Sequence, residues 1–262
     1  MLAIRPPQPI EPAEAKSLWQ NFRIANGGGP EAPLLSPPDA NSKMNKSGRP
    51  DYCLSLSPAR TSGHNVCPFS TPTCRGGCVA FSGRGLGPAA GGTVMSWRSL
   101  KVKFLVEDRD AFCTLVRKEL ELAARRHGKM AVRLNTFSDI PWEEVAPWMY
   151  DIPEVQVYDY TKWPDRKSTS KYHLTFSASD RTTDDQLVAK LTAGQNVAVV
   201  FDVLHRQNGD WQHELPAEFL GFPVIDGDKQ DTRYDDPPGV VVGLRIKGRK
   251  LLADPGKFVR AA

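Results

Sequence analysis

The sequence lacks an apolar run long enough to span a membrane, and it lacks a large excess of either charge. Its first residues, MLAIRPPQPIEPAEAK, contain prolines and acids where an export signal needs an apolar stretch. The 34 Lys and Arg residues nearly balance 30 Asp and Glu, which gives a net charge of +4. We therefore expect a cytoplasmic protein with no membrane partner, for which nucleic acid is an allowed partner but not an indicated one.

Cysteine is also scarce, with five residues in 262. An odd number in a chain without an export signal argues against a disulfide framework and favours metal-binding or reactive thiols. Cys113 lies in DAFCTLVRKELELAARR, whose helical periodicity predicts a small buried hydrophobic residue there. Cys53, in DYCLSLSP, is interpreted as a strand residue, with a role as a fourth metal ligand as the alternative.

The chain length allows one α/β domain with an N-terminal extension. Residues 1–50 predict a helix over 14–24, followed by an arm rich in Pro and Gly. Residues 51–262 predict a single α/β domain that carries the cysteine loop. A long helix is expected over 96–127, with a break near VEDRD.

Beyond residue 128, apolar strand-like runs alternate with helical segments. The runs are MAVRLNTFSD, VQVYDYTK, YHLTFSASD and NVAVVFDV, and TTDDQLVAKLTAG reads as an amphipathic helix opened by Thr and acids. Such alternation predicts parallel βα units, in a sheet or in a partial, TIM-like (βα) barrel. The carboxyl ends of all these strands would then face one rim.

Polar residues recur at these strand ends, and a polar ligand site on the rim explains the whole set better than unrelated helix caps do. The acidic loop VIDGDKQDTRYDDPPG adds Asp226 and an arginine suited to a carboxylate or phosphate, and its other acids are expected to face water. The residues predicted to hold a small polar ligand or nucleotide are Ser138, Asp139, Lys162, Ser177, Asp180, Asp226 and Arg233.

The loop CPFSTPTCRGGCVAFSGRG places Cys67, Cys74 and Cys78 within twelve positions. With His64 added, the spacing fits a Cys3His zinc site, and without it the spacing fits an iron–sulfur cluster with one iron free of protein ligands. The spacings are looser than those of tight zinc loops, and the loop precedes a βα series. We therefore favour a [4Fe-4S] cluster held by the three cysteines, with zinc as the alternative. Arg75 and Arg84 would balance a negative cluster.

Several motifs in order resemble the phage gene product eighty-eight family: the cysteine loop, VRLNTFSDIPWEE, PEVQVYDYTK, YHLTFSASD and VIDGDKQDTRYDDPPGVVVGLRIKG. The resemblance covers residues 54–248 and implies a phage protein in the host cytoplasm, with no established activity. In this family the NTFSD segment more often reads like HDSGDF, so Asn135 and Thr136 stand where His-Asp is usual.

The layout also resembles radical S-adenosylmethionine enzymes, in which a three-cysteine loop follows the first strand of a partial βα barrel. The spacing here is Cys-x6-Cys-x3-Cys rather than Cys-x3-Cys-x2-Cys, and a Gly-Gly-Glu motif is missing. The resemblance implies an enzyme whose open iron binds a small polar ligand or S-adenosylmethionine, with nucleotide or DNA modification as a setting. The alternative is a non-catalytic, zinc-stapled protein that acts on host protein or nucleic acid.

Overall fold

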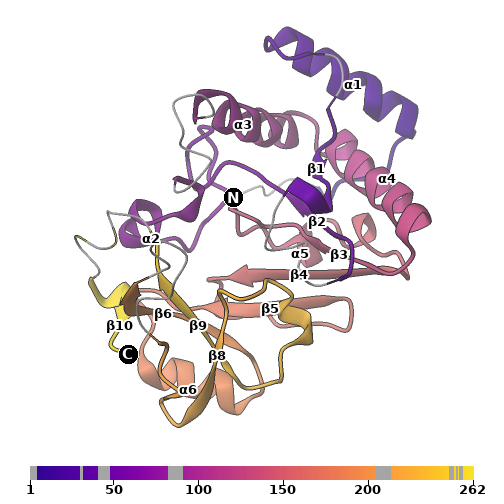
Figure 1. Cartoon of the computed structure of the whole chain (residues 1–262). Coiled ribbons are helices and arrows are strands. Elements are labelled where there is room, and N and C mark those ends of the chain that lie inside the picture. Colours follow the sequence, from indigo (N-terminus) through magenta and orange to yellow (C-terminus); the bar gives the residue numbers. More distant parts are fainter. Residues whose placement is uncertain are drawn as a thin grey trace. The chain divides into compact units, whose positions relative to one another are not determined.

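The structure is a computed structural model that describes residues 5–29, 32–40, 48–81, 91–204, 214–247, 251, 253 and 256–262 (Figure 1). Its helices are α1 (Pro12–Ala25), α2 (Pro72–Gly76), α3 (Gly91–Glu107), α4 (Arg109–His127), α5 (Trp142–Val145) and α6 (Asp184–Thr192). Short 3-10 turns are η1 (Pro38–Ala40), η3 (Val79–Phe81), η5 (Pro147–Met149), η6 (Arg233–Asp235) and η7 (Gly256–Phe258). Within the described ranges, no helix has both the length and the apolar character needed to cross a membrane.

The fold is mixed α/β. Its strands are β1 (Leu35–Ser36), β2 (Asp51–Leu54), β3 (Met130–Arg133), β4 (Val155–Thr161), β5 (Tyr172–Ser177), β6 (Val197–Leu204), β7 (Glu218–Phe219), β8 (Phe222–Asp226), β9 (Val241–Ile246) and β10 (Val259–Arg260). The chain forms two compact units, Met1–Pro68 with Gly85–Val157 and Phe69–Arg84 with Tyr158–Ala262. The division at residue 50 made from the sequence stays a prediction.

In the first unit the strand order is β1-β2-β3-β4, and it is open. β2, β3 and the first residues of β4 are parallel, and β1 adds an antiparallel edge. The predicted break in the long helix is confirmed: Asp108 lies between α3 and α4, and its carboxylate accepts the Ala111 N–H at 2.9 Å as the N-cap of α4. Cys113 is fully buried in α4, as its periodicity predicted.

In the second unit the order is β5-β6-β9-β8-β7, again open, with β10 paired to β6. All of these pairs are parallel except β7–β8, so the carboxyl ends of β5, β6, β8 and β9 share one edge. Helix α6 covers the apolar face of this sheet, where Leu187 and Leu191 join a core with Phe176 and Phe201 (Figure 1). The predicted start of this helix is confirmed, because Thr183 and Gln186 form a capping box.

Candidate functional site

The Cys67 thiol lies in a closed turn of the first unit. Its Sγ accepts the Ala59 N–H at 3.3 Å and donates to the Phe137 carbonyl at 3.4 Å. The Val66 N–H donates to the Ala59 carbonyl at 3.1 Å and closes the same turn. Ala59 has φ +48°, a left-handed conformation that is costly for a residue with a Cβ. Backbone strain is therefore held at the residue whose amide points at this sulfur.

The segment after β3 contacts the same turn. The Asp139 N–H donates to the Val66 carbonyl at 2.8 Å, and Asn135 Oδ1 accepts from Ser138 Oγ at 2.8 Å and from the Ile140 N–H at 2.9 Å. Ser138 and Asp139 are each only 7% exposed. Within this unit, two of the predicted ligand residues thus lie beside one of the predicted metal ligands.

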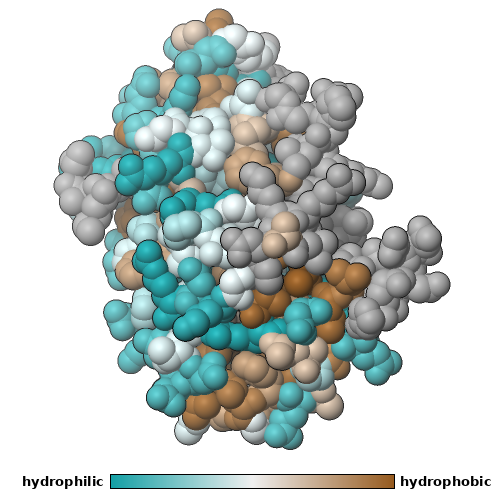
Figure 2. Space-filling view, turned by 90° about the vertical axis from the view of Figure 1, so that its left-hand side faces the viewer, coloured by the Kyte–Doolittle hydropathy of each residue, from teal (hydrophilic) through white to brown (hydrophobic). Residues whose placement is uncertain are grey.

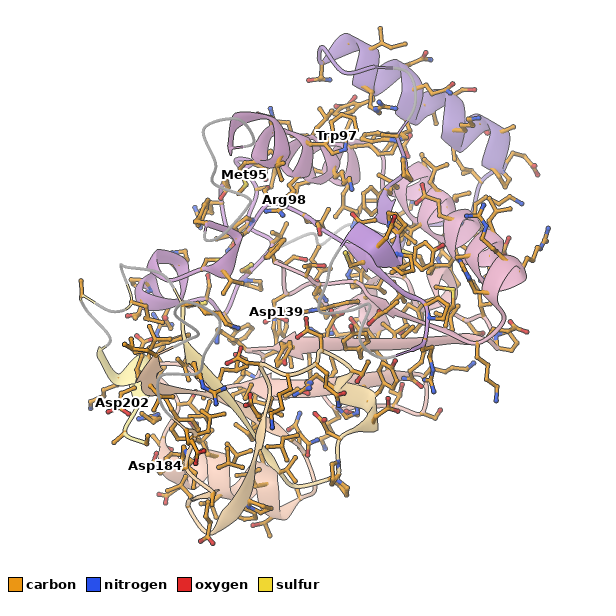
Figure 3. The ribbon with its side chains drawn as sticks, viewed as in Figure 1. Met95, Trp97, Arg98, Asp139, Asp184 and Asp202 are labelled. Carbon is orange, nitrogen blue, oxygen red and sulfur yellow. The ribbon has the colours of Figure 1, made fainter. Side chains whose placement is uncertain are left out.

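Helix α3 contributes a cation to this region. Arg98 projects from α3 toward the sheet, and its guanidinium carbon lies 4.2 Å from the centre of the Phe137 ring. Trp97 projects toward α1, where it contacts the Trp19 ring (Figure 3). Arg98 was not selected from the sequence, because an arginine in a long basic helix gives no signal of its own.

Cys74 and Cys78 belong to the second unit, in and directly after α2. Thr71 caps this short helix, since its Oγ1 accepts the Cys74 N–H at 3.1 Å. Just before the helix, the centre of the Phe69 ring lies 4.6 Å from the centre of the Trp163 ring. Trp163 directly follows Lys162. The cysteine-bearing segment of this unit is therefore packed beside the end of β4. Arg75 donates to the Ser70 carbonyl at 2.7 Å, and Arg84 lies outside the described residues.

This segment also exposes apolar side chains. The exposed fractions of Phe69, Val79 and Phe81 are 40%, 48% and 37%. The face of the molecule in Figure 2 carries brown apolar patches among teal polar residues.

Lys162 and Ser177 meet at the ends of β4 and β5. The Lys162 ammonium donates to Ser177 Oγ at 2.9 Å, to the Ser177 carbonyl at 3.3 Å and to the Ala178 carbonyl at 3.0 Å. It also lies 5.0 Å from the centre of the Phe258 ring. Asp180 follows in the next turn, and its Oδ1 is a buried atom without a hydrogen-bond partner. A carboxylate oxygen placed in this way can accept a hydrogen bond from a ligand.

The acidic loop differs in part from its predicted behaviour. Asp226, at the end of β8, accepts from Arg245 Nη1 at 2.9 and 3.0 Å. The prediction that the remaining acids face water is wrong for Asp228, which is 3% exposed. Its carboxylate accepts the Arg245 N–H at 3.0 Å and pairs with Lys247. Burial of Asp228 costs little because these partners satisfy it. The loop sequence alone does not predict them, because Arg245 lies on β9 and Lys247 directly follows it.

Arg233 is also buried, at 1% exposure, and Asp236 is its ion-pair partner. The two side chains are 3.3 Å apart between Nη1 and Oδ2, and the Asp236 side chain is only 3% exposed, so it too departs from the predicted contact with water. Burial raises the Asp236 pKa to about 6, against the opposing effect of Arg233.

None of the five cysteines forms a disulfide. Cys53 lies in β2, where the sequence placed it, and burial raises the pKa of the Cys113 thiol to about 12. Among the residues that the structure describes, no three His, Cys, Asp or Glu side chains are gathered closely enough to hold a metal ion. The donor set of the loop still fits a soft metal chemically: Cys67, Cys74 and Cys78 are partly exposed thiols, and the Ala59 amide already donates to one of them.

The described residues thus form a mixed α/β protein. Each of its two units carries a part of the cysteine loop and polar residues at strand ends. A family model described as Gene product 88 matches residues 34–261. The chain therefore belongs to the Gene product 88 family, the phage family that its motifs resemble. No curated protein and no solved structure matches it.

Proposed function

We propose that this phage protein is an enzyme that binds a [4Fe-4S] cluster through Cys67, Cys74 and Cys78 and uses the cluster in its reaction. One iron would lack a protein ligand and could take a small polar molecule, a nucleotide or S-adenosylmethionine. The proposal includes a partial (βα) barrel, for which the parallel pairing within each unit is the support. For a phage protein in its host's cytoplasm, we propose that the reaction modifies a nucleotide or DNA.

One observation carries the proposal: in both units, a cysteine-bearing segment lies beside polar residues at a strand end. In the first unit Cys67 contacts the segment that holds Ser138 and Asp139. In the second, Phe69 packs on Trp163, next to Lys162. A loop whose thiols have only a structural role would not require polar strand-end residues beside it in both units.

The chain's own residues would bind and orient the ligand. Three acceptors hold the Lys162 ammonium in place, so it can offer its charge to an anionic ligand. Asp180 Oδ1 lacks a hydrogen-bond partner and can accept from an amine or hydroxyl group. Asp139 would orient a ligand from the segment after β3.

The test is iron, acid-labile sulfide and zinc analysis of the full chain purified without oxygen. We expect brown protein with broad absorbance near ~400 nm and about four irons per chain. Cys67→Ser, Cys74→Ser and Cys78→Ser should each lower the iron content strongly, whereas Cys113→Ala, which removes a buried thiol outside the loop, should not. A change in the electron paramagnetic resonance spectrum on adding S-adenosylmethionine would identify that molecule as a ligand of the open iron.

The zinc alternative makes opposite predictions. Colourless protein with about one zinc per chain and no iron would overturn the cluster proposal. His64 is exposed, so His64→Ala should not disturb the fold. This variant should lose the metal if the site is Cys3His and retain it if the three cysteines hold a cluster.

A further inference from the structure

Turn η6 buries a guanidinium whose hydrogen bonding is incomplete. Arg233 Nη2 donates to the Gln230 carbonyl at 2.7 Å. Its Nε and Nη1 are buried atoms with no hydrogen-bond partner, because the approach of Asp236 Oδ2 to Nη1 lacks hydrogen-bond geometry. A buried N–H group without an acceptor has lost its hydrogen bonds to water and gained none, so a guanidinium with two such nitrogens requires a further acceptor.

The strand that η6 contacts presents two more incomplete polar groups. Alternation along β5 places His173 and Thr175 on one face, whereas Tyr172 and Phe176 lie on the other, where Tyr172 contacts Asp159. His173 Nε2 and Thr175 Oγ1 are buried without hydrogen-bond partners, and Thr175 is 0% exposed. Arg233 lowers the pKa of His173, after the larger effect of burial, so the two side chains are neighbours.

These groups, His173, Thr175, Arg233 and Asp236, form what we call the η6–β5 cluster. The Asp236 carboxylate is the buried anion of the cluster, and its Oδ2 is also a buried atom without a hydrogen-bond partner. Asp235 is a second anion nearby, since it raises the pKa of both His173 and Asp236. Asp235 on η6 is exposed. The Asp236 pKa of about 6 leaves this carboxylate mostly ionised at pH 7, and its compensation of the Arg233 charge is lost as the pH falls through 6.

An oxyanion would supply acceptors to the unpartnered donors. Its oxygens can accept hydrogen bonds from the guanidinium, the hydroxyl and the imidazole, and its charge adds to the compensation of Arg233 by Asp236. We infer that the η6–β5 cluster binds the phosphate or carboxylate group of a small ligand, with Arg233 as the main counter-ion. The inference rests on the proposed function, because it names the chemical class of the ligand. Binding of the anion itself requires no metal.

The first experiment measures binding of inorganic phosphate and, separately, succinate to the full chain by calorimetry and by the shift in melting temperature. Both forms of the protein are used, as purified without oxygen and after chelation. We expect saturable binding of at least one anion in both forms, and the two probes distinguish a phosphate site from a carboxylate site. Absence of binding by both anions would overturn the inference. It would mean that water alone satisfies the polar groups of the η6–β5 cluster. Iron content tests only the [4Fe-4S] proposal, whereas anion binding tests only this inference. The failure of one is therefore distinguishable from the failure of the other.

Thr175→Val is the decisive variant, because it removes one unsatisfied hydroxyl and keeps the side-chain shape. It should weaken anion binding about five-fold and leave the protein at least as stable. Arg233→Lys should weaken binding further, and Arg181→Gln, which removes an exposed arginine, is the matched control. If affinity is the same in wild type, Thr175→Val and Arg233→Lys, the inference is wrong even where an anion binds.

A pH series with sulfate, whose charge is constant over the range, adds a further test. Protonation of Asp236, whose pKa is about 6, should tighten sulfate binding as the pH falls from 7.5 to 5.5. In Asp236→Asn this increase should be smaller. Sulfate affinity that falls as the pH is lowered would contradict the assignment of Asp236.

Discussion

Lys162 donates to the Ser177 hydroxyl at 2.9 Å, and two further carbonyl acceptors, Ser177 O and Ala178 O, complete its three donors. The lysine is thus held at the end of β4 by the end of β5. An ammonium with three acceptors is charged and fixed in place, which suits the binding of an anionic ligand and stabilises the ends of both strands.

Lys162→Met should therefore destabilise the second unit by about 2 kcal/mol, since charge-assisted hydrogen bonds contribute more than neutral ones. Ser177→Ala, which removes one of the three acceptors, should cost about 1 kcal/mol. Urea unfolding followed by circular dichroism measures both effects. Lys167 is an exposed lysine of the segment after β4, so Lys167→Met is the matched control. Equal stability of Lys162→Met and Lys167→Met would show that the three contacts contribute nothing.

Ala59 gives a prediction of opposite sign. At φ +48° its Cβ is strained, and glycine adopts this conformation without that cost. Ala59→Gly keeps the N–H that donates to Cys67 and should raise stability by about 1 kcal/mol in thermal unfolding. Ala193 is exposed and has an ordinary φ of −76°. The control Ala193→Gly should be neutral or slightly destabilising, and a gain of the same size there would refute the strain at Ala59.

The regular elements were largely predictable because their signals are local. The threonines and acids of TTDD predicted where α6 starts, and VEDRD marked the break between α3 and α4. The buried positions of the strand runs β3 to β6 are apolar except at Asp159, Thr161 and Thr175. By contrast, β1, β7 and β10 have two residues each, which is too short for any periodicity to show.

The candidate site was less predictable, because its contacts depend on partners distant in the chain. The sequence singled out Lys162 and Ser177 separately, but only the fold shows that they contact each other. The burial of Asp228 depends on Arg245 and Lys247, which no pattern in the acidic loop contains. His173 and Thr175 were missed because unsatisfied burial leaves no mark in a sequence.

Lys101 gives a prediction about pH dependence. Its ammonium donates to the Leu34 carbonyl at 2.5 Å, and Glu119 accepts the Leu34 and Leu35 N–H groups at 2.8 and 2.7 Å. Burial lowers the Lys101 pKa to about 8, while Glu119 and Cys53 oppose the shift. The unfolded chain then binds more protons above pH 8, so the free energy of unfolding should rise as pH increases from about 8 to 10.5.

Urea unfolding at pH 7.5, 8.5, 9.5 and 10 tests this dependence, with Lys101→Met as the variant that lacks the group. The free energy of unfolding of the wild type should rise relative to that of Lys101→Met across the series. Curves that run parallel would mean that Lys101 titrates as it does in the unfolded chain.

Thr183 tests whether the capping box stabilises α6. Thr183 Oγ1 accepts the Gln186 N–H at 3.3 Å, and Gln186 Oε1 accepts the Thr183 N–H at 3.0 Å. Thr183→Ala removes the first bond and should cost about 1 kcal/mol, whereas Thr183→Ser should restore most of it. Thr192 is exposed in the last position of the same helix, so Thr192→Ala should change stability by less than about 0.5 kcal/mol. Equal losses at both ends would rule out a specific cap.

Helix α1 precedes the family match, which starts at residue 34, and it packs on the first unit. Trp19 carries the attachment: it is 4% exposed, its ring lies 4.9 Å from that of Phe104, and its Nε1 donates to the Ala32 carbonyl at 2.9 Å. Trp19→Ala should release α1 at a cost of about 3–5 kcal/mol to its local stability. Hydrogen exchange should show loss of protection in 12–25 with the strands of the same unit still protected. Leu18, one residue earlier, is 36% exposed, and Leu18→Ala should leave protection unchanged. Equal loss of protection in α1 and in β2 and β3 would mean instead that α1 is an integral part of the core of the first unit, because the whole unit would then depend on this one side chain.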